Sequence, residues 1–399
     1  MYDFDEIIDR RRPNSLKWSQ TKPILTSEQR AVDPLPLWVA DMDFRVAQPI
    51  IDAVREEVDF GVFGYGEVPH SCLEAIIDWQ DRRFGWRPKP EWIVQTPGVV
   101  NAVNTCIQTF TNPGDFILVQ PPVYFHIHND ITLNGRRALH APLVLDGDRY
   151  RFDPEIFEAA IRPGTKLFIL CNPHNPTGNV FSRVELLVMA EICAKHGILI
   201  ISDEVHQDFI LDRTKKHVPF AALDDVIADN SIVCTAPSKT FNIAGLQCAN
   251  IFIPNERRRQ DFQTQCAKNG ANLMNTMGIV ACEAAYRHCE SWADAMLEYV
   301  RNSQKHFARR IQELGLPVRV IPGDALYLAW LDCRALGKSA TDLHDFFIRE
   351  AKVWLDPGTK FGPGGEGFMR VNVACPRNML DEAINRIAGG IEAHRSIPA

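Results

Sequence analysis

Three polar residues follow short apolar runs in this 399-residue chain, and their types suit covalent chemistry on a carbonyl compound. Lys239 stands just past the run 231–234, among small and apolar residues. A lysine in such surroundings has a lowered pKa and can form a Schiff base with a carbonyl group. A solvated surface charge is the alternative for any single lysine, so Lys239 needs support from other residues.

Asp203 and the segment 172–178 give that support. Asp203 follows the aliphatic run 198–201, where an ionised carboxylate is costly unless a cation or a hydrogen-bond donor meets it. It could cap a following helix or pair with a protonated ring nitrogen of a cofactor. The segment 172–178, Asn-Pro-His-Asn-Pro-Thr-Gly, holds amide side chains between prolines that exclude a helix, although an ordinary turn could have the same sequence.

The runs that precede these residues predict parallel β-strands. They lack the polar alternation of half-exposed strands, as expected where helices cover both faces of a sheet. The runs are 116–119, 167–170, 198–201 and 231–234. Between the second and third, apolar residues at helical spacing predict a helix over 183–196 that stops at Gly197. Ligands of such sheets bind beyond the carboxyl ends of the strands, where the three candidates stand.

We therefore expect an α/β fold with a mostly parallel central sheet, helices on both of its faces, and a smaller α+β domain formed by both chain ends. Residues 46–288 would form the large domain and 289–399 the small one. Residues 1–45 would pack on the small domain. A long amphipathic helix is expected through 286–314.

Composition excludes several classes of protein. Lys and Arg number 43 against 50 Asp and Glu, a net charge of -7, which argues against binding to nucleic acid or anionic lipid. The longest apolar run, 325–331, is far shorter than the roughly 20 residues that span a bilayer. The acidic start does not resemble a signal peptide, so we expect a cytoplasmic protein without a membrane segment.

Cysteine and histidine spacing predicts neither disulfides nor a metal site. The eleven cysteines are odd in number and form no Cys-x-x-Cys pair, which favours buried free thiols. His126 and His128 could share a metal on one face of a strand, but no carboxylate or cysteine accompanies them at ligand spacing. We therefore expect no metal.

The three motifs also resemble those of a known family. NPHNPTG, SDEVH and PSKTFN are similar, in order and approximate spacing, to the asparagine, aspartate and lysine motifs of fold-type I enzymes that use pyridoxal 5'-phosphate (PLP), in the class I/II aminotransferase superfamily. Five further strings resemble the branch that contains cystathionine β-lyases and other carbon-sulfur lyases: LWVADMDF, TPGVVNAV, SKTFNIAGLQ, YLAWLDCRALG and GGEGFMRVNVACPR. The resemblance covers essentially the whole chain.

The resemblance implies PLP as cofactor and a role for each matching residue. Lys239 would bind the cofactor as a Schiff base and later move the Cα proton of the substrate. Asp203 would pair with the pyridinium nitrogen, and Asn175 with the phenolic oxygen. Arg370, together with Asn175, would hold the α-carboxylate of the substrate.

The remaining roles also come from the resemblance. Tyr124 would stack on the cofactor ring, with a core aromatic as the alternative. The cofactor phosphate would bind the backbone N–H groups of Gly98, Val99 and Val100 and the hydroxyl of Ser238. Tyr65 resembles a tyrosine that reaches the partner's phosphate across a dimer interface, which implies a homodimer with a shared active site.

Three positions depart from the wider superfamily. His206 stands where aminotransferases commonly have a tyrosine that hydrogen-bonds the phenolic oxygen. Gln247 replaces a common phosphate-binding arginine, so the charge of the phosphate needs a different partner, which the sequence does not identify. Ala236 replaces a common serine. His206 and the string AGLQ look like the lyase branch.

These features favour β-elimination over transamination. The predicted enzyme cleaves cystathionine or a related cysteine S-conjugate, a small amino-acid substrate, to a thiol, pyruvate and ammonia. Lys239 or a tyrosine would give a proton to the leaving sulfur. A PLP-dependent aminotransferase uses the same residues and stays the alternative, with a PLP-binding regulatory protein as a third possibility.

Overall fold

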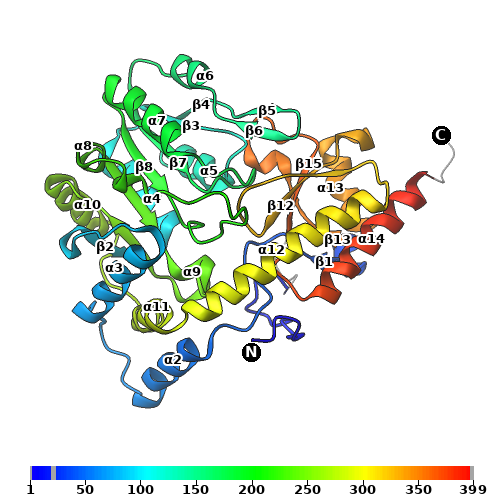
Figure 1. Cartoon of the computed structure of the whole chain (residues 1–399), viewed down its shortest axis with the longest axis horizontal. Helices are drawn as coiled ribbons and strands as arrows, with labels where there is room; N and C mark the ends of the chain where they lie inside the picture. Colours follow the sequence, from blue (N-terminus) through cyan, green and yellow to red (C-terminus); the bar gives the residue numbers. More distant parts are fainter. Residues whose placement is uncertain (1, 19–23, 396–399) are drawn as a thin grey trace.

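The central feature of the computed structural model, which describes residues 2–18 and 24–395, is a twisted sheet (Figure 1). Within these residues the sheet has seven strands, in the order β2-β10-β9-β8-β7-β3-β4. Their bounds, in that order, are Ile93–Thr96, Ala249–Phe252, Ser231–Thr235, Leu199–Asp203, Thr165–Cys171, Phe116–Val119 and Arg137–His140. Strands β9 to β4 pair in parallel, and β10 runs antiparallel to both of its neighbours. The predicted α/β fold with a mostly parallel sheet is confirmed.

All four predicted strands are present because their side chains are buried on both faces of the sheet. In β3, Leu118 packs into one apolar cluster, whereas Ile117 and Val119 pack into the cluster on the opposite face. Neither face meets water, so the runs show no polar alternation. The predicted helix after β7 is also confirmed as α7, Arg183–Lys195, which begins with a capping box at Ser182.

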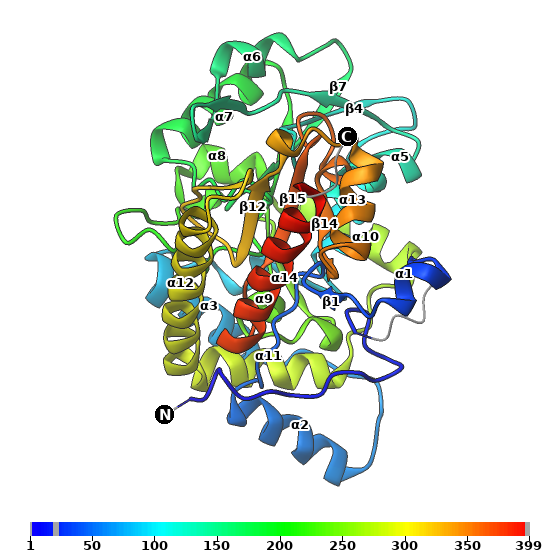
Figure 2. The same cartoon turned by 90° about the vertical axis from the view of Figure 1, so that its right-hand side faces the viewer.

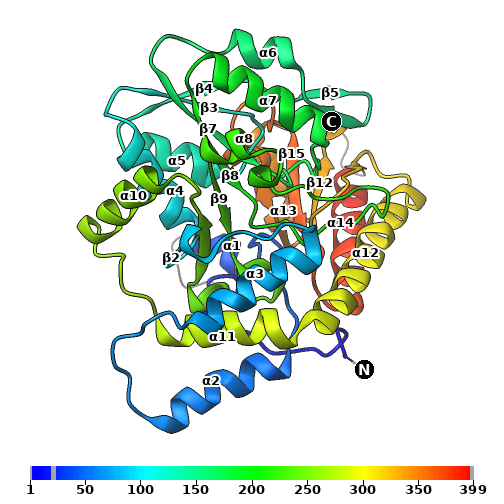
Figure 3. The same ribbon diagram turned by 60° about the vertical axis from the view of Figure 1, so that its left-hand side comes forward.

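Helices cover both faces of this sheet. On one face pack α4 (Val99–Phe110), α5 (Phe125–Leu133) and α10 (Glu256–Lys268). On the other pack α3 (His70–Phe84), α7 and α11 (Thr276–His288). Figure 3 shows α2 (Gln48–Phe60) beside α11 at the lower edge of the molecule. Shorter elements in this part of the chain include α6 (Pro154–Ala159), α8 (Asp225–Asp229), α9 (Pro237–Thr240), β5 (Val144–Asp146) and β6 (Arg149–Arg151).

A second sheet is antiparallel and lies beside the first. In the described part of the chain its order is β11-β12-β15-β14, with bounds Arg319–Ile321, Leu328–Asp332, Phe368–Asn372 and Asp356–Pro357. Three helices pack on it through one apolar cluster: α12 (Glu290–Glu313), α13 (Ala340–Arg349) and α14 (Arg377–Arg395). Helices α12 and α14 lie side by side (Figure 2).

The start of the chain lies against residues near its end. Strand β1, Leu35–Pro36, pairs in parallel with β13, Val353–Trp354. Just after β1, the ring of Trp38 stacks on Trp354 at 4.4 Å between centroids. Helix α1, Ser27–Ala31, precedes β1 and begins with a capping box at Thr26. The domain boundaries at 45 and 288 stay predictions.

Two features differ from the expectations. The long helix expected through 286–314 is confirmed as α12 over 290–313, but its first residues belong to α11, because Cys289 leaves helical geometry (φ -114°, ψ 17°) and its N–H closes the end of α11. His126 and His128 lie in helix α5, not on a strand, because Ile127 and Ile131 pack onto the sheet at helical spacing. Side chains two residues apart on a helix do not face each other, so the two histidines share no metal there.

All eleven cysteines are buried and free, as predicted. Within residues 2–18 and 24–395, no three His, Cys, Asp or Glu side chains gather where they could hold a metal ion. None of the helices in these ranges combines the length and the apolar character needed to cross a membrane.

Candidate active site

A cavity of about 180 Å³ lies at the carboxyl ends of β7, β8 and β9. This is the edge where ligands bind in parallel sheets. Nine of the predicted site residues line it: Gly98, Val99, Val100, Tyr124, Asn175, Asp203, His206, Ser238 and Lys239. The structure thus brings together residues from widely separated parts of the sequence, as the motifs predicted.

Lys239 projects from α9, a single helical turn that begins at Pro237. The next residue fixes this turn, because the Thr240 hydroxyl donates a hydrogen bond of 2.7 Å to the buried Asp208 carboxylate. Loss of water is the main reason why the pKa of Lys239 falls to about 8, with Asp41 and Asp203 opposing the fall and Arg370 adding to it. Near neutral pH a useful fraction of this amine is therefore unprotonated and nucleophilic.

Asp203 ends β8 and is 6% exposed. Its Oδ1 accepts a hydrogen bond from the N–H of Val205 at 3.1 Å, and turns rather than a helix follow it, which excludes the helix-cap alternative. Burial raises the pKa of this carboxyl to about 6, although Val205 and Lys239 pull it down. No ion pair of Asp203 occurs among the described side chains. A cationic ring nitrogen at this position would relieve the cost of burying the carboxylate.

Arg370 reaches the same site from β15 of the second sheet. Its Nη1 donates to Asn175 Oδ1 at 3.1 Å, and its Nη2 donates to Asp356 Oδ2 at 2.8 Å and to the Trp38 carbonyl at 3.0 Å. The Nε atom has no hydrogen-bond partner in the described part of the chain. Because Arg370 holds Asn175 directly, the two residues predicted to meet the substrate carboxylate lie together.

The Asn175 loop is held rigidly by its own polar groups. The buried ring of His174 lies between the carbonyl oxygens of Cys171 and Pro122, at 3.2 and 3.0 Å, and as a neutral imidazole it donates its single N–H to one of them. Asn172 accepts a hydrogen bond from the N–H of Phe181 at 3.3 Å. The asparagine amide that faces the cavity is therefore positioned by the fold before any ligand binds.

Two helix beginnings form another wall of the cavity. Helix α4 begins at Val99 after Gly98 and has no acidic residue in its first turn. The first N–H groups of a helix have no partner within it, so they attract anions. Ser238 adds a hydroxyl from α9, whereas Gln247 adds no charge. Among the described residues that line the cavity, Lys239 is the one lysine or arginine, so the free N–H groups at the start of α4 are the other groups there that could attract an anion.

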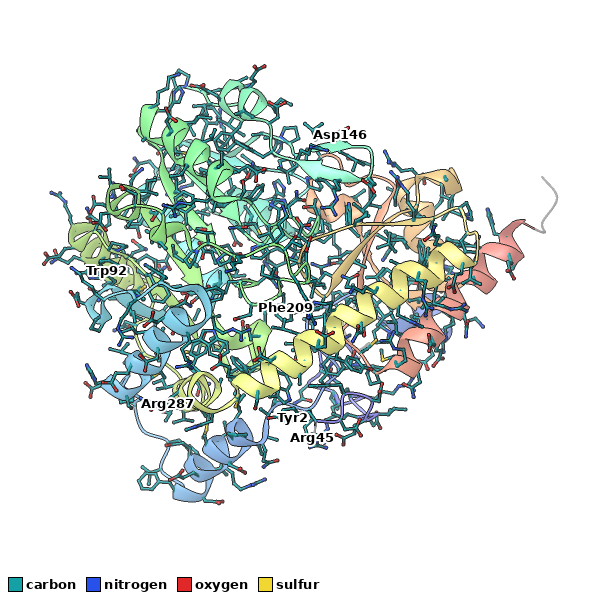
Figure 4. The ribbon with its side chains drawn as sticks, viewed as in Figure 1. Tyr2, Arg45, Trp92, Asp146, Phe209 and Arg287 are labelled. Carbon is teal, nitrogen blue, oxygen red and sulfur yellow. The ribbon has the colours of Figure 1, made fainter. Side chains whose placement is uncertain are left out.

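Tyr124 and His206 complete the predicted set of cavity side chains. Burial raises the pKa of the Tyr124 hydroxyl, so it stays protonated. Burial also lowers the pKa of His206 well below its usual range, and its Nδ1 has no hydrogen-bond partner among the described residues. The His206 ring packs edge-on against Phe209 and Tyr327. Figure 4 shows Phe209 near the middle of the molecule, between the green strands of the central sheet and α12.

Two predicted residues do not line the cavity: Arg370 contacts it through Asn175, whereas Tyr65 does not. It lies on the connection between α2 and α3, is 91% exposed, and is absent from the cavity lining. A single chain therefore does not bring Tyr65 into the site. Its neighbours Phe60, Val62 and Phe63 are also large, apolar and exposed.

Sequence reasoning missed three groups that act on the site: the Ala40 carbonyl, which accepts a 2.8 Å hydrogen bond from Lys239 Nζ, and the side chains of Asp356 and Lys360. A backbone carbonyl leaves no signal in a sequence. Asp356 offered a weak one, since it stands alone after the apolar run 353–355.

Comparisons with known proteins agree with this geometry. The chain is 42% identical over 391 residues to the cystathionine beta-lyase PatB of Bacillus subtilis, a match that covers 98% of this chain and all of that protein. Cystalysin of Treponema denticola, whose crystal structure contains PLP, is 31% identical, with a TM-score of 0.93 over 99% of this chain and all of that one. A PLP-bound C-S lyase of Staphylococcus hominis is 29% identical, with a TM-score of 0.91 over 98% of each chain.

The family model described as aminotransferase class I and II matches residues 33–387. This range includes the lysine, aspartate and asparagine motifs, Arg370 and both sheets. The resemblance read from the motifs is thereby confirmed, and the chain belongs to the class I and II aminotransferase family.

Proposed function

We propose that the protein is a PLP-dependent carbon-sulfur lyase that cleaves cystathionine or a related cysteine S-conjugate by β-elimination, giving a thiol, pyruvate and ammonia. The main observation behind this proposal is that Lys239 and Asp203 line the same cavity. Asn175 lines it too and accepts a hydrogen bond from Arg370. The named lyases to which the chain is similar over nearly its whole length support the same reaction.

The cavity residues fit PLP. Asp203, a buried carboxylate without an ion-pair partner in the described structure, suits the protonated pyridine nitrogen, and Asn175 suits the phenolic oxygen. The first turn of α4 and Ser238 suit the phosphate. Bound to Lys239, PLP supplies an electron sink for the carbanion that forms at the substrate Cα. The Tyr124 ring would lie against the cofactor ring.

The chain's own groups bind the substrate and move its protons. Arg370 and Asn175 hold the α-carboxylate, which orients the Cα–H bond relative to Lys239. With a pKa near 8, the Lys239 amine can accept the Cα proton, and the Ala40 carbonyl at 2.8 Å stabilises the ammonium that results. Tyr124, which burial keeps protonated, or the Lys239 ammonium then gives a proton to the departing sulfur.

A second copy of the chain is part of the proposal. Tyr65 and the exposed side chains Phe60, Val62 and Phe63 form an apolar surface that a homodimer would cover. Tyr65 would then contact the phosphate bound in the partner. We place this enzyme in the cytoplasm, where eleven reduced cysteines are stable.

The test is to incubate the purified PLP-loaded enzyme with L-cystathionine and no keto acid. We expect pyruvate, ammonia and a free thiol in equal amounts, and none of them from Lys239→Ala. The alternative reaction, transamination, would instead require an added keto acid and would return an amino acid. Binding of PLP without turnover of any cysteine S-conjugate would favour a regulatory protein.

A further inference from the structure

Arg370, the proposed substrate-carboxylate residue, already has an ionic partner. Its Nη2 lies 2.8 Å from Asp356 Oδ2, and both side chains are 2% exposed. The pairing of β14 with β15 places Asp356 directly opposite Arg370, so the contact is built into the sheet. An arginine neutralised in this way attracts a substrate carboxylate weakly, because Asp356 repels the incoming charge.

Lys360 changes this balance. It lies four residues after Asp356, on the short helix η5, Gly358–Phe361, and its Nζ is 2.7 Å from Asp356 Oδ1. Asp356 thus gives one oxygen to each of two cations. The three charges sum to one positive charge, which matches the single negative charge of a substrate α-carboxylate.

The surroundings of the three charges are largely aromatic. Lys360 Nζ lies over the rings of Trp38 and Phe125, at 5.6 and 5.8 Å, and the Arg370 guanidinium lies over Phe361 at 4.9 Å. Such rings stabilise a cation, and around the buried Asp356 and Arg370 they replace water that would otherwise screen the charges, although Lys360 itself stays partly exposed. A surplus positive charge therefore acts strongly on a carboxylate that binds beside it.

We propose that Lys360 is a positioning residue for the substrate α-carboxylate: it holds Asp356, and so leaves the charge of Arg370 available to the substrate. The inference rests on the proposed function, which assigns the carboxylate to Arg370. It also gives Asp356 a role, since its two oxygens fix the arginine and the lysine relative to each other.

The experiment compares Lys360→Met, Lys360→Arg and the double variant Asp356→Asn/Lys360→Met. For cystathionine, we expect Lys360→Met to raise KM about tenfold and to change kcat less than about twofold. The substitution removes a charge that helps to bind the carboxylate, but Lys360 does not touch the reacting atoms. Lys360→Arg should restore KM. The double variant should also bind better than Lys360→Met, because the carboxylate that neutralises Arg370 is gone.

Lys338 gives the matched control. Its Nζ lies over the Phe346 ring at 4.8 Å, also in the part of the chain after α12, and it forms no hydrogen bond or ion pair with any described site residue. Lys338→Met should leave KM unchanged. Thermal unfolding of every variant shows whether it is folded, and Lys360→Met, which removes a side chain that is 37% exposed, tests the proposal even if the double variant is unstable.

Propionate and propylamine separate this inference from the proposed reaction. Propionate has a carboxylate but no amine, so its binding, measured as a shift in the unfolding temperature of the PLP-loaded protein, should weaken about tenfold in Lys360→Met. Binding of propylamine should not change. Equal propionate binding in wild type and Lys360→Met, or a double variant no better than Lys360→Met, overturns the inference. Absence of pyruvate from wild type with intact propionate binding overturns the lyase assignment alone.

Discussion

The Nζ atom of Lys239 donates a hydrogen bond to the carbonyl oxygen of Ala40 at 2.8 Å, although 199 residues separate the two in sequence. The Tyr327 hydroxyl donates to the same oxygen at 2.9 Å. The residue after Ala40 is Asp41, whose charge raises the pKa of Lys239 against the effect of burial. The protonation of this lysine therefore depends on a segment that lies outside the central sheet.

Reconstitution with PLP should depend on the protonation of Lys239. A Schiff base forms from the neutral amine, and with a pKa of about 8 the neutral fraction grows roughly tenfold per pH unit below that value. We expect the rate of PLP uptake by cofactor-free protein to rise from pH 6.5 to 8 and to level off above. Absorbance of the bound cofactor, followed in time, measures the rate.

Asp41→Asn is the comparison for this experiment. Because Asp41 raises the pKa of Lys239, its removal should move the plateau of the uptake rate to lower pH. An uptake rate that is independent of pH over the same range would contradict the assignment of Lys239 as the amine that limits binding.

Asp203→Asn should stabilise the cofactor-free protein and inactivate the loaded one. Folding raises the pKa of Asp203 from 3.8 to about 6, so the ionised carboxylate destabilises the fold. The penalty is absent below about pH 4 and complete above pH 6, where it approaches about 3 kcal/mol. Urea unfolding at pH 8 should therefore show a more stable variant, and at pH 4 no difference.

With PLP bound, the same substitution removes the carboxylate that we propose to hold the proton on the pyridine nitrogen. We expect kcat to fall at least about a hundredfold, measured as pyruvate release. A variant that is less stable than wild type without cofactor, yet keeps its rate, would show that Asp203 is a structural residue.

Hybrid dimers test the proposed role of Tyr65. In a dimer of one Tyr65→Ala chain and one Lys239→Ala chain, one site has both defects and the other has none, provided that each Tyr65 serves the partner's site. Random assembly makes half of the dimers hybrids, so mixing two inactive variants should restore about a quarter of the wild-type activity. Co-expression followed by a pyruvate assay measures it, and no recovery would place Tyr65 outside the partner's site.

Lys17 should be a major source of stability for the first 45 residues. Its side chain is fully buried, and its Nζ is 2.6 Å from Asp43 Oδ2 and 3.1 Å from the Asp41 carbonyl. Lys17→Met would leave Asp43 short of one cation, so we expect a loss of about 3 kcal/mol in the free energy of unfolding, measured with urea.

Lys195 provides the matched substitution. Its Nζ is also 2.6 Å from a carboxylate, that of Glu158, but the lysine side chain is 66% exposed. Lys195→Met should cost less than about 1 kcal/mol, because water screens the pair. Similar losses for the two variants would show that burial of Lys17 adds nothing to the strength of its pairing.

The sequence predicted four of the seven strands described in the central sheet, β3, β7, β8 and β9, because strands buried on both faces leave continuous aliphatic runs. Chain order then placed Asn175, Asp203 and Lys239 at one edge of the sheet, where the cavity lies. His126 and His128 were considered as a pair on one face of a strand, whereas contacts of Ile127 with the sheet select a helix there.

Other features had no local signal. The periodic pattern continues across Cys289, and the break there depends on the backbone angles of a single residue. The contacts of Ala40 with Lys239, and of Asp356 with Arg370 and Lys360, join segments that only the folded chain brings together. Such groups are found from coordinates, not from residue spacing.

The pairing of β1 with β13 has a consequence for how the protein is made. Leu35 leaves the ribosome early in synthesis, but its partner Val353 leaves only when the chain is nearly complete. Domains fold as their residues emerge, so the first forty residues must wait for a late strand before they can settle. The Ala40 carbonyl can accept its hydrogen bond from Lys239 only after that step. The Lys239 amine of a nascent chain would therefore have a different pKa from that of the finished enzyme.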